Sequence, residues 1–90
     1  MLFLVERFCP GLREEDLDPM VGELQAQAAT MTAAGQPVTH VSSTFLAEDE
    51  TCLCFFESES AEFVAEVNEL AGARFDRIVA ATALRLGVRS

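Results

Sequence analysis

The chain has 90 residues, with 15 acidic and 6 basic side chains, and its formal net charge is −9. This length leaves room for one small domain, so a two-domain enzyme is excluded. Half of the residues are hydrophobic, which indicates a packed globule rather than a disordered chain. Because the net charge repels phosphate groups, we expect neither nucleic acid nor a membrane surface as a partner.

Residues 2–8 form a short apolar run that stops before Pro10-Gly11, which predicts a strand followed by a turn. The next stretch has apolar side chains at the spacing of one helical face. Asp18-Pro19 predicts the cap and first position of the regular part of this helix, after a turn at residues 13–17, and Gly35 predicts its end. The apolar face consists of Leu17, Met20, Val21, Leu24, Ala28 and Met31.

Residues 37–45 are rich in β-branched and aromatic side chains, which favour the extended state, and they predict a second strand. The acidic cluster at residues 47–50 predicts a hairpin connection. Residues 51–57 then return as a third strand.

A second helix is predicted after Ser60, whose hydroxyl suits an N-cap, and before Gly72, which suits the position just past a helix end. Residues 75–82 predict a last strand. We assign residues 1–82 to a single domain and residues 83–90 to a C-terminal tail. The apolar stripe of the second helix consists of Phe63, Val64, Val67 and Leu70.

The predicted order β-α-β-β-α-β favours an α+β, ferredoxin-like fold with a four-stranded antiparallel sheet and both helices on one face. The other face of such a sheet would leave leucine and phenylalanine side chains uncovered, which monomers rarely tolerate. We therefore expect a homodimer, a dimeric α+β barrel in which two sheets face each other and enclose a cavity.

The longest uncharged start is residues 1–5, which is too short for a signal-peptide core, so we expect a cytoplasmic protein. Cys9, Cys52 and Cys54 are odd in number, and in a reducing compartment they are most simply buried free thiols. The C-x-C pair resembles half of a soft-metal site, which leaves a metal or redox role as the alternative.

Several blocks along residues 2–81 together resemble the small nickel-responsive proteins. The resemblance implies a ferredoxin-like α+β barrel dimer, and it implies architecture more firmly than chemistry. The blocks are Phe3-Leu4-Val5-Glu6-Arg7, Pro10-Gly11, Ser43-Thr44-Phe45, Asp49-Glu50-Thr51-Cys52, Cys54-Phe55-Phe56-Glu57, Asn68-Glu69-Leu70-Ala71-Gly72 and Phe75-Asp76-Arg77-Ile78-Val79.

The chain departs from the nickel-binding proteins it resembles in its histidines. Those proteins carry a histidine where the second helix ends, and this chain has Ala71 there and a single histidine, His40. Because nickel prefers nitrogen ligands, a metal site here would need carboxylates, thiolates or a second subunit.

His40 is the first candidate ligand. If the hairpin folds about residues 48 and 49, His40 lies opposite Glu57, and Cys52 and Cys54 point to the other face. We therefore predict His40 and Glu57 as the candidate metal ligands, for a divalent ion such as nickel. A register change of one residue would reverse this grouping, and a solvated or hydrogen-bonded His40 is the simpler interpretation.

Glu6 and Arg77 complete the candidate ligand-binding set with His40 and Glu57. Glu6 and Arg7 are neighbours in a strand, so only one of them can face the cavity, and the sequence does not say which. Arg77 lies in the last strand, either paired with a local acid or as an anion-binding group.

The favoured function is a small homodimeric binding protein that holds a metal ion or a small ligand between its sheets. One alternative is a cofactor-free enzyme of the α+β barrel monooxygenase or isomerase kind, with His40 as general base and Arg77 steadying an oxyanion. Another is an adaptor that binds a second protein. The chain has no P-loop, GxSxG or HExxH motif to support nucleotide binding or the common hydrolase mechanisms.

Overall fold

The computed structural model describes residues 1–84, which form one sheet and two helices. Strand β1 spans Leu2–Phe8, β2 Val38–Leu46, β3 Thr51–Ser58 and β4 Arg77–Ala81. The strand order in the sheet is β2-β3-β1-β4, and every neighbouring pair is antiparallel. The predicted ferredoxin-like fold is confirmed.

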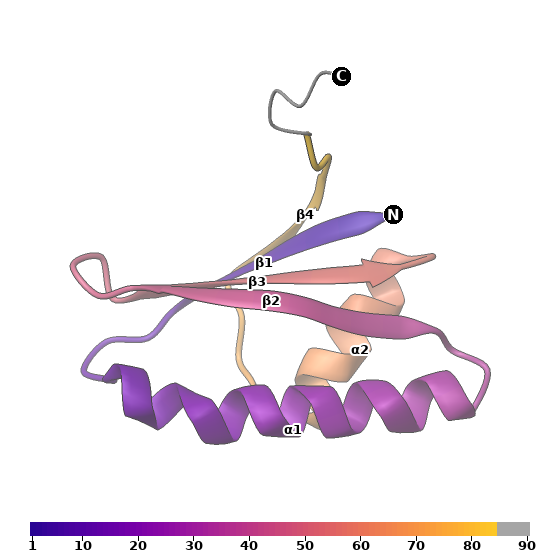
Figure 1. The fold of residues 1–90 in the computed structure, drawn as a ribbon, viewed down its shortest axis with the longest axis horizontal. Helices are drawn as coiled ribbons and strands as arrows, with labels where there is room; N and C mark the ends of the chain where they lie inside the picture. Colours follow the sequence, from indigo (N-terminus) through magenta and orange to yellow (C-terminus); the bar gives the residue numbers. More distant parts are fainter. Residues whose placement is uncertain (85–90) are drawn as a thin grey trace, which may run out of the picture.

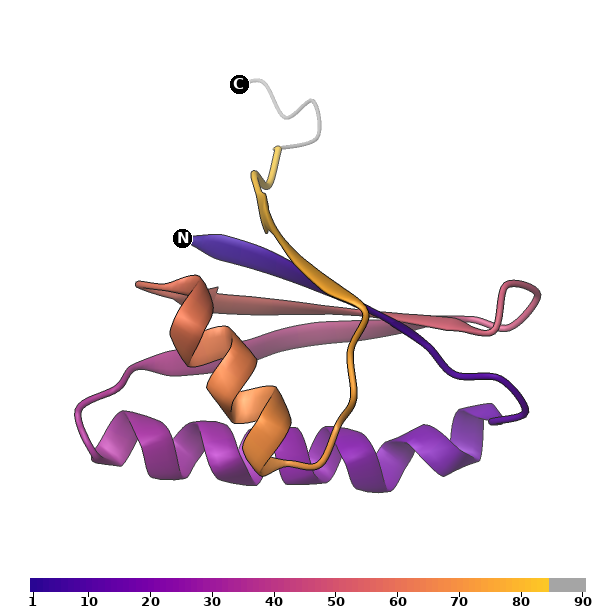
Figure 2. The same ribbon diagram turned by 180° about the vertical axis from the view of Figure 1, so that it is seen from behind.

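Helix α1 spans Glu14–Ala33 and α2 spans Ala61–Leu70. Both helices lie on the same side of the sheet (Figures 1 and 2). In Figure 1, α1 runs beneath β2, and α2 lies behind α1 and β2. We call the opposite side of the sheet the open face, because no described helix covers it. None of the helices within residues 1–84 is long and apolar enough to cross a membrane. Of the predicted tail, residues 85–90 lie outside the described part of the chain.

The start of α1 differs from the prediction of a turn before Pro19. The helix begins at Glu14, because Arg13 is an extended N-cap residue whose N–H donates to the carboxylate of Asp16 at 2.8 Å. Pro19 lies inside the helix, where its missing N–H would have bonded to the carbonyl of the exposed residue Glu15. Because Glu15 is exposed, water can satisfy that carbonyl in place of the missing N–H.

Helix α2 begins and ends as predicted. The Ser60 hydroxyl accepts a hydrogen bond from the N–H of Phe63 at 3.2 Å, and Gly72 follows the C-cap with a φ of 68°.

The core lies between the sheet and the helices. Val5, Leu24, Phe56, Val64 and Val67 are completely buried there. Burying a side chain of this size stabilises the fold by about 1.5–3 kcal/mol, so this layer supplies the main driving force for folding.

Candidate functional site

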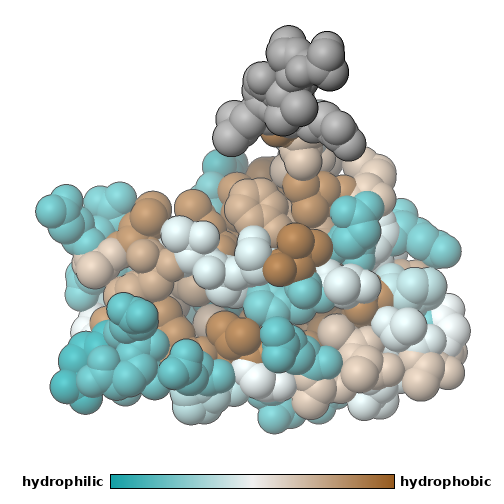
Figure 3. Space-filling model, viewed as in Figure 1, coloured by the Kyte–Doolittle hydropathy of each residue, from teal (hydrophilic) through white to brown (hydrophobic). Residues whose placement is uncertain are grey.

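The open face carries a patch of apolar side chains at the centre of the sheet. Leu4 lies between Phe55 of β3 and Val79 of β4, and Leu53 follows on the same side of β3. We call Leu4, Leu53, Phe55 and Val79 the open-face patch. All four are half-buried in the single chain, and hydrophobic surface gathers over the strand layer in Figure 3.

Two more exposed apolar side chains, Phe8 and Leu46, lie on the same face toward the hairpin. Phe8 and Leu46 both pair with Thr51, and they are 50% and 38% exposed. A single subunit therefore leaves several apolar side chains uncovered on one side of its sheet, and uncovered apolar side chains that gather on one face indicate an interaction site.

Glu6 and Arg77 form the polar pair beside the open-face patch. The two residues are register partners in β1 and β4, and Arg77 donates from Nε and Nη2 to the two carboxylate oxygens of Glu6, at 3.0 Å each. This forked hydrogen bond holds the pKa of Glu6 below its ordinary value. Glu6 therefore faces the open side, which answers the question left open by the sequence.

Glu57 also belongs to the open face, where it pairs with Leu2. Its carboxylate lies 3.0 Å from the amino group of Met1, and its side chain is 57% exposed. Glu6, Glu57 and Arg77 thus lie on one side of the sheet.

His40 lies on the other side of the sheet, and its predicted position opposite Glu57 is wrong. The β2–β3 register shifts between His40 and Ser42, so His40 pairs with Phe56 and Glu57 pairs with Thr39. The hairpin folds about residues 48 and 49 as expected, but the extra residue at the bulge turns His40 toward the helices. The structure therefore does not bring His40 and Glu57 together.

The bulge places His40 in a chain of hydrogen bonds with two thiols. The Ser43 hydroxyl donates to Sγ of Cys54 at 2.8 Å, and Nε2 of His40 lies 2.8 Å from the Ser43 oxygen. Since the hydroxyl has only one hydrogen, Nε2 is the donor to Ser43. Sγ of Cys52 lies 3.7 Å from Sγ of Cys54. We call His40, Ser43, Cys52 and Cys54 the thiol cluster.

The thiol cluster favours a negative charge on Cys54. Hydrogen bonds from Cys52 and Ser43, together with the nearby imidazole of His40, hold the pKa of Cys54 well below the usual thiol range, although burial opposes them. The shared proton and burial raise the pKa of Cys52 instead. Of the two thiols, Cys54 is therefore the one that loses its proton more readily. Cys9, Cys52 and Cys54 are all buried and free of disulfides, as predicted.

Arg7 lies on the helix-covered side of β1, next to Cys52 in the register. It is 2% exposed, and it donates to the carbonyls of Ala73 and Arg74 at 3.1 Å and to Oδ1 of Asn68 at 2.6 Å. Among the described residues no carboxylate pairs with it. Its positive charge helps to lower the pKa of Cys54.

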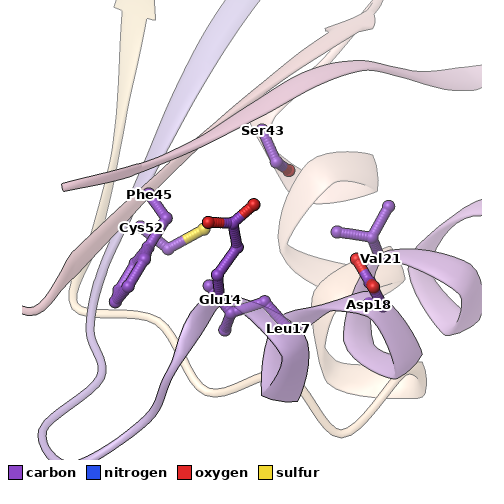
Figure 4. Close-up of a pocket in the computed structure, with 7 residues that line it drawn as sticks. All are labelled: Glu14, Leu17, Asp18, Val21, Ser43, Phe45 and Cys52. Carbon is purple, nitrogen blue, oxygen red and sulfur yellow. The ribbon is translucent and has the colours of Figure 1, made fainter. Parts of the chain in front are cut away.

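A groove of about 300 Å³ leads to the thiol cluster between α1 and the hairpin. Cys52 and Ser43 line its sheet side, and the carboxylates of Glu14 and Asp18 reach toward them from α1 (Figure 4). No group of three or more His, Cys, Asp or Glu side chains within residues 1–84 is arranged to hold a metal ion.

Ser43 and Arg7 were not predicted as members of this site. Arg7 alternates with Phe3 and Val5 in β1, so strand periodicity could have placed it on the buried side. Ser43 contacts His40 only because of the bulge, and no glycine or proline in the sequence indicates a bulge there.

Comparison with known proteins supports this architecture. The model of the family described as "Nickel responsive protein SCO4226-like" matches residues 3–80. The chain belongs to this family. The crystal structure of SCO4226 from Streptomyces coelicolor A3(2) is similar, with a TM-score of 0.71 and 22% sequence identity over 94% of this chain and 100% of that chain. A search of curated proteins found no match.

Nickel is the ion that the family description suggests, and the described side chains do not fit it well. Nickel is a borderline metal that suits imidazole nitrogen. The chain has one histidine, and Nε2 of this residue is used by Ser43 while Nδ1 is buried without a partner among residues 1–84. The carboxylate expected beside it, Glu57, lies on the opposite face.

Proposed function

We propose that the protein is a small homodimeric binding protein that holds a small ligand between two facing sheets. The observation that carries the proposal is the open-face patch, which lies uncovered beside the Glu6–Arg77 pair. Packing two such faces together removes the apolar side chains from water. A cavity with apolar walls and a few polar groups is the usual form of a small-molecule site.

The polar groups suggest how a ligand would be held. Arg77 is 61% exposed in the single chain, so its guanidinium can release part of its bond to Glu6 and bind an anionic group. Glu6 and Glu57 can accept hydrogen bonds from the ligand. The proposed ligand therefore combines an apolar body with an anionic or hydrogen-bonding end.

Native mass spectrometry of protein purified from its own cell extract tests the proposal. We expect a dimer that retains a small-molecule adduct, and we expect Arg77→Ala to lose the adduct but remain dimeric. Arg74→Ala is the matched control, because Arg74 is an exposed arginine whose carboxylate partner is Asp76. A wild-type dimer whose measured mass is always that of two polypeptide chains alone would contradict ligand binding.

The nickel version of the proposal has its own test. Since His40 and Glu57 lie on opposite faces, we expect calorimetric titration with nickel to give no heat that depends on His40. A nickel heat that disappears in both His40→Ala and Glu57→Gln would restore the two residues as ligands of one ion.

The enzyme alternative has less support. A general base at His40 and an oxyanion group at Arg77 would have to share a site, but these residues lie on opposite faces of the sheet and in its two edge strands. The adaptor alternative would gain support if an apolar patch stayed exposed in the dimer.

A further inference from the structure

The thiol cluster is a separate feature from the open face, and the proposed function does not use it. Cys52 and Cys54 lie on one side of β3, and their sulfur atoms are 3.7 Å apart. Two thiolates that bind one ion at about 2.3 Å each lie roughly 3.7 to 4.6 Å apart, as the angle at the ion opens from tetrahedral to linear. The observed separation lies at the tetrahedral end of this range, so the sulfur atoms would move apart by up to about 0.9 Å to bind one ion in a linear arrangement.

We propose that Cys52 and Cys54 bind a monovalent soft metal ion, copper(I), on the helix-covered side of the sheet. Soft thiolate ligands select copper(I), and this ion accepts two sulfur ligands without further protein groups. The site therefore does not need the third or fourth ligand that a zinc site requires.

The hydrogen bonds around Cys54 prepare it as a ligand. A sulfur atom that accepts from the Ser43 hydroxyl, itself held by His40, is already polarised toward the thiolate that a metal requires. Binding forms two sulfur–copper bonds and releases to solvent the protons that the two thiols carry. His40 and Ser43 act as positioning residues and not as ligands.

Charge distinguishes a monovalent ion from a divalent one at this site. Two thiolates and one copper(I) ion leave a net charge of −1, which the buried guanidinium of Arg7 would neutralise. A divalent ion would leave the thiolates neutral and Arg7 without a counter-charge in a buried setting, which is unfavourable. The absence of a carboxylate partner for Arg7 among the described residues therefore favours copper(I).

The groove beside Cys52 provides a way in for the ion. Ser43 and Cys52 line it together with the acidic side chains of Glu14 and Asp18 (Figure 4). These carboxylates would raise the local concentration of cations at the entrance.

Competition with bicinchoninate, a chromophoric copper(I) chelator, under anaerobic reducing conditions tests the proposal. Wild-type protein should remove one copper(I) per subunit from the coloured complex. We expect Cys52→Ser and Cys54→Ser each to weaken binding by at least about 100-fold, because each variant removes one of two ligands. Cys9→Ser is the matched control and should bind like the wild type, since Cys9 is buried outside the thiol cluster.

The positioning role of Ser43 and His40 has a separate readout. Ser43→Ala and His40→Ala should weaken binding by roughly 10- to 100-fold. Ser43→Thr keeps a hydroxyl that can donate to Sγ of Cys54, so it should restore most of the binding lost in Ser43→Ala. Equally weak binding in Ser43→Thr and Ser43→Ala would contradict this role.

Two results would overturn the proposal even if a serine variant failed to fold. One is a copper X-ray absorption spectrum of the wild-type complex that shows only nitrogen or oxygen neighbours. The other is binding of zinc or nickel at the same cysteines as tightly as copper(I), which would refute the role given to Arg7.

Discussion

The guanidinium of Arg7 connects β1 to the segment after α2. Its three hydrogen bonds go to Asn68, Ala73 and Arg74, which are more than 60 residues away in the sequence. All of these hydrogen bonds go to neutral oxygen atoms, so each of them matters for keeping the charge buried.

We predict that Arg7→Met lowers the free energy of unfolding by about 3 kcal/mol, because the buried oxygen atoms of Asn68 and Ala73 lose their donor. Urea unfolding measures this change. Arg13→Ala is the control and should stay within about 0.5 kcal/mol of the wild type, since its side chain is 73% exposed. Equal stability of the two variants would contradict the role of Arg7.

The carboxylates of Glu6 and Asp76 give the protein a defined response to acid. Hydrogen bonds from Arg77 to Glu6, and from Arg74 to Asp76, lower the pKa of each carboxyl from the ordinary values of 4.5 and 3.8. A lowered pKa in the folded state stabilises the fold above the ordinary value, and this contribution is lost as the pH falls through the lowered value.

We therefore predict that the free energy of unfolding is insensitive to these two groups above about pH 5.5 and declines as the pH falls below about 4.5. Carboxyl titration by NMR should place Glu6 below 4.5 in the wild type. In Arg77→Ala the value should return toward normal, whereas Arg13→Ala should leave it unchanged. A normal value in the wild type would show that the Glu6–Arg77 pair does not form.

At the scale of the elements, turn residues and apolar spacing determine most of the fold. The bounds of all four strands and of α2 lie close to those predicted, because Gly72, Ser60 and Pro10-Gly11 mark chain reversals. The start of α1 was harder to predict, since the helix begins at Glu14, and the Asp16 side chain that caps it lies three residues before the proline that suggested a later start.

The face of His40 could not be predicted for a related reason. Strand alternation assigns faces only if the ladder is regular, and a bulge near Val41 changes the assignment of every residue beyond it. The sequence around Val41 contains no residue type that requires a bulge. By contrast, Glu6 and Arg77 lie on regular parts of their strands. Their pairing could be predicted once it was known that Glu6, and not Arg7, faces the open side.

Two glycines should respond in opposite ways to alanine. Gly72 has a φ of 68°, and a Cβ there would meet no atom within 4 Å, so Gly72→Ala should cost about 1 kcal/mol through backbone strain alone. Gly22 lies within α1, where a Cβ would also meet open space, so Gly22→Ala should stabilise the protein by about 0.5–1 kcal/mol. Thermal unfolding measures both. A stabilising Gly72→Ala would contradict the assigned role of Gly72 at the end of α2.

At the scale of the whole molecule, the two sides of the sheet have different roles. Helices cover one side and bury the thiol cluster there, while the other side leaves the open-face patch beside Glu6 and Arg77. The proposed ligand site requires a second copy of the chain to cover this open side. Without it, there would be no enclosed cavity and no reason for the apolar side chains to gather there.

Sedimentation equilibrium at micromolar concentration tests this claim most directly. We predict a mass twice the 9.8 kDa of one chain for the wild type. Phe55→Asp should dissociate to a folded monomer, because it places a charge in the centre of the open-face patch. Leu70→Asp, which changes an exposed leucine of α2, should remain dimeric. A wild-type mass of 9.8 kDa across that concentration range would contradict the account.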